Sequence, residues 1–128
     1  MTLKQYRDYF RDAFGWTHAI SSGKIDDSEE IAVCFLNSER EIENIQTYGG
    51  AKKGYNLKAI TILLRYTKDA DEAEEMAVRI QDFFHKKSFL IGEQSVFAHV
   101  IYNEPIWIGA NDDGVCQYSF EIDFIEKI

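Results

Sequence analysis

The side chains that could do acid, base or metal chemistry are thinly spread along this sequence. Its three histidines are His18, His85 and His99, and none lies at ligand spacing from another histidine or from a cysteine. A metal site needs several such groups at close range, and a catalytic histidine needs a partner. The pattern therefore predicts no metal site and no catalytic residue, and we expect His85 at a helix end, where a cation is favourable.

The two cysteines each lie inside an apolar segment that is typical of a strand. Neither Cys34 nor Cys116 has a second cysteine or a histidine nearby in the chain. Such cysteines are most often buried, reduced thiols. A disulfide between them, or a reactive thiol at either position, is the alternative that the sequence leaves open.

One glycine-rich segment comes close to a phosphate-binding motif. Gly49 and Gly54 have the spacing of the two glycines in that loop, but Tyr55 and Asn56 stand where a lysine and a serine or threonine are required. The segment therefore predicts no nucleotide or other cofactor. We expect a connection between strands that is able to contact a partner.

The segment at residues 111–114, Asn-Asp-Asp-Gly, resembles part of a calcium loop. If Gly114 took the sixth position, Gly109 and Phe120 would stand first and twelfth, where carboxylates are required. A hairpin turn between two strands explains the segment better. No pattern in the chain requires an enzyme, and an active site would have to gather His99, Cys116 or the loop acids through folding.

Hydrophobic spacing predicts two helices that must position these residues. The first covers residues 2–14, since Thr2 and Gln5 have the form of a capping box and apolar residues follow at helical spacing until Gly15. The second covers residues 69–84 and carries an apolar stripe, with acids in its first turns and bases after its end.

Five strands are predicted from runs of apolar and β-branched residues. They cover residues 31–37, 56–66, 96–102, 106–110 and 116–124, whereas residues 16–30 have the composition of a loop. The strand at 56–66 is apolar on two faces and should be central. We therefore predict one α+β domain over residues 1–128, with about five strands and two α-helices.

The charge balance excludes some partners. The chain has 22 acidic and 14 basic residues, a net charge of −8. Because binding to phosphates requires a basic surface, we expect no sequence-specific nucleic-acid binding. The longest apolar run, residues 31–36, is far shorter than a bilayer span, and no secretory signal is evident. We therefore expect a soluble protein of the cytosol with no membrane partner.

Charge is also arranged in two neighbouring blocks. Residues 24–45 hold seven acids against two bases, and residues 46–68 hold five bases and no acid. Blocks of this kind are most often solvated surfaces. They can also be complementary halves of a contact between identical subunits.

From residue 45 to its end, the chain resembles a family of small virion proteins of long-tailed phages and prophages, the minor capsid and tail-terminator (tail-completion) proteins. The resemblance begins at Tyr48, Gly49 and Gly50 and continues in residues 59–65, which run into the helix at 71–84. It ends with residues 105–109, the turn at 113–114, and residues 118–120. The order and spacing of these pieces carry the resemblance.

The resemblance implies an α+β subunit with a mixed, mostly antiparallel sheet of about five strands flanked by two α-helices. It also implies a structural role in the virion, at the junction of head and tail, after synthesis in the cytoplasm of the bacterial host. The subunit would form a ring, commonly of six, that stops growth of the tail tube and docks the head. Its partners would be copies of itself, tail-tube proteins and head-connector proteins. The surfaces that we expect to contact a subunit or partner are the glycine-rich segment and the hairpin tip, namely Tyr48, Gly49, Gly50, Lys52, Lys53, Asn111, Asp112 and Asp113.

A different function remains open from the residues alone. An α+β scaffold with two helices on a sheet also serves small-molecule-binding and regulatory modules. Such a module would show a ligand-dependent shift in melting temperature without forming a ring.

Overall fold

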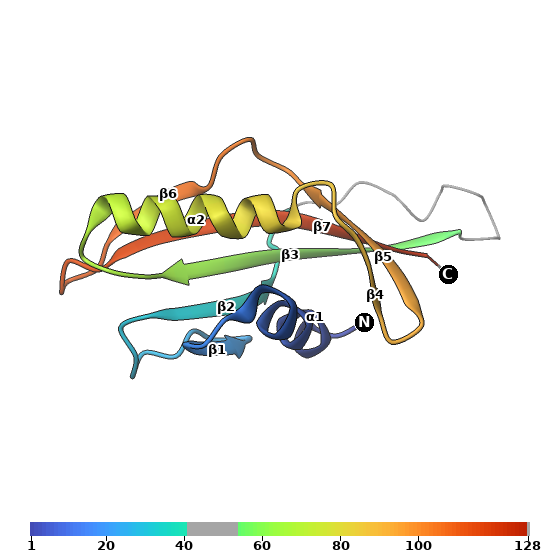
Figure 1. Cartoon of the computed structure of the whole chain (residues 1–128), viewed down its shortest axis with the longest axis horizontal. Coiled ribbons are helices and arrows are strands. Elements are labelled where there is room, and N and C mark those ends of the chain that lie inside the picture. The colour runs from blue at the N-terminus through green and yellow to red at the C-terminus, as the bar shows by residue number, and fades with distance from the viewer. Residues whose placement is uncertain (41–53, 128) are drawn as a thin grey trace.

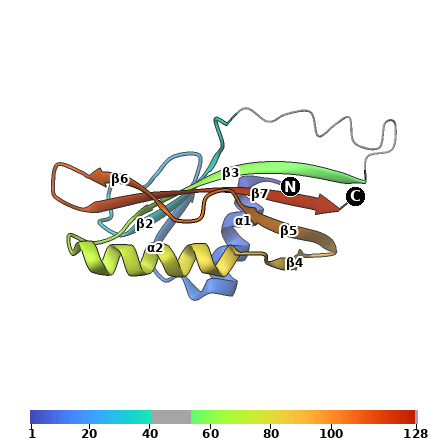
Figure 2. The same cartoon turned by 90° about the horizontal axis from the view of Figure 1, so that it is seen from above.

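The computed structural model describes residues 1–40 and 54–127, which form one sheet with both helices on the same side (Figures 1 and 2). In chain order, the helices and strands are α1 (Leu3–Phe10), the π-helical turn η1 (Arg11–Gly15), β1 (Ala19–Ser22), β2 (Ala32–Asn37), β3 (Tyr55–Arg65), α2 (Ala70–Phe84), β4 (Ser88–Ile91), β5 (Gln94–Val100), β6 (Ile106–Ala110) and β7 (Cys116–Lys127).

The sheet is built around two long antiparallel strands, β3 and β7, which pair along their whole length. Beside β3 come β2 and then β1, and the β1–β2 pair is the parallel one. The other side of β7 is shared, because β5 pairs with residues 122–126 and β6 pairs with residues 116–119. β4 then pairs with β5. Among the described strands, β1, β4 and β6 each have one neighbour and are therefore edges.

One face of this sheet and the two helices enclose the hydrophobic core (Figure 2). Alternate residues of each strand point to this face, because the side-chain period of a strand is two. In β3 these residues are Ile60, Ile62 and Leu64, and in β7 they are Phe120, Ile122 and Phe124, all fully or almost fully buried. The other sides of β3 and β7 form a face that carries no described helix.

The first helix begins at the predicted capping box. The Gln5 backbone N–H donates to Thr2 Oγ1 at 3.3 Å, and the Thr2 N–H donates to Gln5 Oε1 at 2.8 Å. After α1, the π-helical turn ends at Gly15, whose φ of 84° is readily adopted only by glycine. Tyr6 and Phe10 are buried against the sheet, so the predicted amphipathic helix is confirmed.

The second helix is capped by Asp69, whose side chain accepts from the N–H groups of Asp71 and Glu72 at 3.0 and 3.2 Å. Four apolar residues of the predicted stripe are buried, and they are Ala73, Ala77, Ile80 and Phe84. Their spacing of three or four residues places them on one side of the helix, where they pack on the core. The predicted second helix is confirmed.

The predicted α+β class and the five predicted strands are confirmed, but the strand count was too low. The structure adds β1 and β4, so the expectation that residues 16–30 contain only a loop is wrong. Both added strands have four residues and no strong alternating pattern. They form strands because they pair with β2 and β5, respectively. This pairing depends on the tertiary structure, so it cannot be predicted from the sequence of β1 or β4 alone.

Candidate functional site

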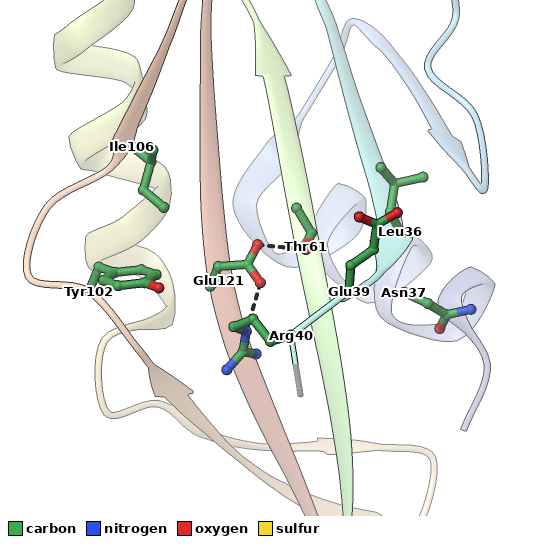
Figure 3. Close-up of a pocket in the computed structure, with 8 residues that line it drawn as sticks. All are labelled: Leu36, Asn37, Glu39, Arg40, Thr61, Tyr102, Ile106 and Glu121. Atoms are coloured by element: carbon green, nitrogen blue, oxygen red, sulfur yellow. Dashed lines mark hydrogen bonds and ion pairs between the residues drawn. The ribbon is translucent and has the colours of Figure 1, made fainter. Parts of the chain in front are cut away.

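The helix-free face of the sheet carries a cluster of hydrogen-bonded polar side chains at its centre (Figure 3). Arg40 Nε donates to Glu121 Oε1 at 2.7 Å, and its Nη2 donates to Asp123 Oδ1 at 2.6 Å. Thr61 Oγ1 donates to Glu121 Oε2 at 2.5 Å, and Ser38 Oγ donates to Glu121 Oε1 at 2.7 Å. β3 places Thr61 directly opposite Glu121, whereas Ser38 and Arg40 follow the end of β2.

A cavity of about 580 Å³ lies beside this cluster. It spans β2, β3 and β7 and the segment that leads into β6 (Figure 3). Its lining combines charged with apolar side chains, namely Leu36, Asn37, Glu39, Arg40, Thr61, Tyr102, Ile106 and Glu121.

The charged groups of this cluster are hydrogen-bonded to one another. Burial alone would lower the pKa of Arg40, but its hydrogen bonds to Asp123 and Glu121 outweigh burial and raise that pKa. Both oxygens of Glu121 already accept hydrogen bonds, so this carboxylate is poorly suited to take a proton from a substrate. The arrangement instead fastens the segment after β2 to the face of β7.

We predict that replacing Arg40 with methionine lowers the free energy of unfolding by about 1–2 kcal/mol, because two neighbouring carboxylates on β7 lose their shared cation. The loss should be smaller than for a fully buried pair, since the Arg40 side chain is 24% exposed. Urea denaturation measures it. Arg11→Met is the matched control, because Arg11 pairs with Asp8 and Asp12 at a more exposed position and should change stability little. Equal losses in the two variants would contradict this role for Arg40.

The predicted turn at residues 111–114 joins β6 to β7. Asn111 Oδ1 accepts from the backbone N–H groups of Asp113 at 3.0 Å and Val115 at 2.9 Å, and the Gly114 N–H donates to the Asn111 carbonyl at 2.9 Å. The hairpin prediction is therefore confirmed. Asn111 is occupied in shaping the turn, whereas Asp112 and Asp113 are exposed at its tip and available to a partner.

The rest of the predicted contact surface lies outside the described residues. Tyr48, Gly49, Gly50, Lys52 and Lys53 all fall in residues 41–53. Their role in a contact remains a prediction from the sequence.

Sequence reasoning missed an exposed apolar segment on β6. Ile106, Trp107 and Ile108 are 37%, 52% and 51% exposed, although they form part of a strand. The register shifts between Trp107 and Gly109, which leaves Ile108 at a β-bulge. Pro105 just before the strand was a signal of an edge position, because proline lacks the N–H that an inner strand donates.

The two charge blocks meet within one chain through Arg65. This guanidinium is buried and donates to the backbone carbonyls of Asp26, Glu29 and Glu30, and it lies 3.5 Å from Asp27 Oδ1. One base of the basic block therefore anchors the loop that carries four acids of the acidic block. This part of the charge pattern serves the fold of the subunit.

The histidines and cysteines stand apart in the structure. His18 lies edge-on to Trp16, His85 caps the end of α2, and His99 lies opposite Asp123 in the sheet. Cys34 and Cys116 are buried and free, and their places in the strands put them on opposite faces of the sheet. The prediction of buried thiols is confirmed.

The described residues lack a metal-binding cluster and a membrane-spanning helix. Within residues 1–40 and 54–127, no group of three histidine, cysteine or acidic side chains could hold a metal ion. In the same part of the chain, neither helix has the length and apolar character needed to cross a bilayer.

Comparison with known proteins gives one family. A family model described as "Bacteriophage tail terminator protein" matches residues 12–128, which include every described strand and α2. No curated protein and no solved structure shows significant similarity to the chain.

Proposed function

Because the chain belongs to the bacteriophage tail terminator family, we propose that it forms a ring at the head-proximal end of a phage tail tube, where it stops tube growth and docks the head. The family is a structural one, and the chain is accordingly a phage structural protein. The match over residues 12–128 is the observation that carries the proposal. We assign the protein no catalytic role, and we place it in the virion.

The physical requirement for such a protein is a closed assembly. A head-to-tail contact between identical subunits makes an open filament unless its rotation closes the ring. A tube grows because its last layer exposes the surface that the next layer binds. A closed ring that covers this layer, and whose far side differs from it, ends growth and gives the head connector a new surface.

The described surface offers features that suit assembly. β6 exposes apolar side chains at a sheet edge, and Asp112 and Asp113 stand at the adjoining hairpin tip. Large exposed apolar groups on a folded domain are typical of protein–protein contact sites.

Native mass spectrometry and negative-stain microscopy test the proposal. We expect the purified protein to form a closed ring, of six subunits if it follows the commonest family pattern, and to cap tail tubes at one end. Tubes assembled with the protein should stop at defined lengths, whereas tubes assembled alone should continue to grow. A protein that stays monomeric at all concentrations and binds neither tube nor head connector would exclude the proposed function.

A further inference from the structure

Two edges of the sheet expose apolar side chains with opposite charges around them. The first, which we name the β6 surface, consists of Ile106, Trp107 and Ile108 with a rim of acids, Glu104, Asp112 and Asp113. All three acids are exposed. Two bases, Arg65 and Lys68, line a cavity together with Asp113. By strand register, Trp107 lies on the helix-bearing face beside Tyr118, and Ile106 lies on the helix-free face. The β6 surface therefore wraps around the sheet edge, and its margin is mainly negative.

The second edge, which we name the β4 surface, has the reverse charge. Its apolar residues are Leu90, which is 62% exposed, and Phe97 on the paired strand β5. Its bases are Lys86 and Lys87, directly before β4. Lys86 is exposed, whereas the Lys87 ammonium lies over the Phe83 ring, 4.5 Å from its centroid. Glu93, in the turn after β4, is an exposed acid of this surface, so two bases stand against it.

These surfaces lie toward opposite ends of the molecule. β6 and β5, the neighbour of β4, pair with different ends of β7, and β6 and β4 lie toward opposite ends of the fold in both views (Figures 1 and 2). A ring of identical subunits needs two different, complementary surfaces on separate sides of each subunit. We propose that the β6 surface of one copy packs against the β4 surface of the next copy around the ring. This contact rests on the proposed ring function and names the surfaces that close it.

The β4 surface of a second copy complements the β6 surface better than another β6 surface would in a twofold contact. Two β6 surfaces together would oppose their acidic rims, which is unfavourable. The β4 surface instead offers bases to the acids, and it offers Leu90 and Phe97 to Trp107 and its neighbours. Opposite charges around an apolar centre are the usual arrangement of a specific protein contact.

The contact uses side chains more than backbone hydrogen bonds. The bulge at Ile108 interrupts the regular edge of β6, and bulges of this kind prevent simple extension of a sheet by another strand. We therefore expect Trp107 and Ile108 to pack against Leu90 and Phe97 without forming one continuous sheet. Tryptophan is a residue on which such contacts often depend.

Cysteine cross-linking tests which surfaces meet. With a short bis-maleimide reagent, a variant carrying both Ile108→Cys and Leu90→Cys should give a ladder of covalent oligomers up to the size of the ring. Each single variant should stay uncross-linked, whereas a mixture of the two should give dimers. The wild type, treated with the same reagent, is the control that shows whether its buried Cys34 and Cys116 react. Dimers of the Ile108→Cys variant by itself would show a β6–β6 contact and overturn the proposal.

Charge reversal tests the complementarity of the rims. A form with Glu104→Lys and Asp113→Lys has two basic surfaces, and a form with Lys86→Glu and Lys87→Glu has two acidic ones. Each form alone should assemble about tenfold less tightly, because like charges then meet at every contact. Mixing the two forms should restore assembly, since alternating copies again place acid against base. Lys24→Glu, an exposed reversal outside both surfaces, is the control and should assemble as the wild type does.

The failure of this contact and the failure of the ring function give different results. If the wild type forms a ring and caps tubes while both reversed forms also assemble normally, the contact is overturned and the function stands. If the wild type stays monomeric and leaves tubes uncapped, the function is overturned and the contact with it. If the reversed forms fail alone and recover when mixed, and the ladder requires both cysteines, the contact is supported.

Discussion

Replacing Phe10 with alanine should lower the free energy of unfolding by about 3–5 kcal/mol, the range for large-to-small changes of a buried aromatic residue. Phe10 is fully buried and lies among five aromatic rings from α2, β2 and the segment after α1. The ring centroids of Phe14, Trp16, Phe35, Phe83 and Phe84 lie 4.9 to 6.2 Å from that of Phe10. Truncation would leave a cavity where these elements meet.

Urea denaturation followed by circular dichroism measures this loss. Phe97→Ala is the matched control, because it removes the same atoms from a ring that is 37% exposed on β5. We expect the control to lose less than half as much stability as Phe10→Ala. Similar losses in both variants would contradict the view that Phe10 joins α1 to α2 and the sheet.

Glu126→Gln should destabilise the protein at neutral pH by about 1–3 kcal/mol, the usual cost of disturbing hydrogen bonds to a buried charged group. Glu126 is buried near the end of β7 and accepts from the Tyr6 hydroxyl, from Asn56 Nδ2 at 3.0 Å and from the Met1 nitrogen at 3.2 Å. Burial alone would raise the pKa of Glu126, but these hydrogen bonds and the positive charge of the Met1 ammonium group lower that pKa.

The lowered pKa of Glu126 determines how its contribution to the free energy of unfolding depends on pH. A carboxyl group whose pKa is lower in the folded state contributes stability that is fully present above its unfolded pKa, near 4.5, and is lost as the pH falls through its folded pKa. The wild type should therefore exceed Glu126→Gln in stability above pH 4.5, and the difference should shrink as the solution is acidified further.

Chemical denaturation at a series of pH values tests this expectation. Glu93→Gln, in the exposed turn between β4 and β5, is the control for the same chemical change and should follow the wild type closely. A difference between the wild type and Glu126→Gln that stays constant below pH 4.5 would show that the charge of this carboxylate is not its source.

Local sequence was sufficient for the elements that carry a strong period or specific turn chemistry. In the capping box at Thr2 and Gln5, in the apolar stripe of α2 and in the turn at Asn111, the interacting residues are separated by only a few positions. The geometry of each feature can therefore be derived from its own spacing. The order of features also pointed to the tail terminator family, and the family match confirms it. The same order could not show that β6 leaves Trp107 exposed, because exposure depends on whether another element covers the strand.

By itself, then, the sequence determined the helices, the principal strands, the burial of the cysteines and the family, since each follows from residue type and near neighbours. The tertiary structure alone decided β1, β4 and the polar contacts at the sheet. Arg40 lies 81 and 83 positions from Glu121 and Asp123, and Tyr6 lies 120 positions from Glu126. The physical reason is that these contacts form only when α1 and the segment after β2 pack against β7, and the sequence of one segment does not specify which distant strand will lie beside it.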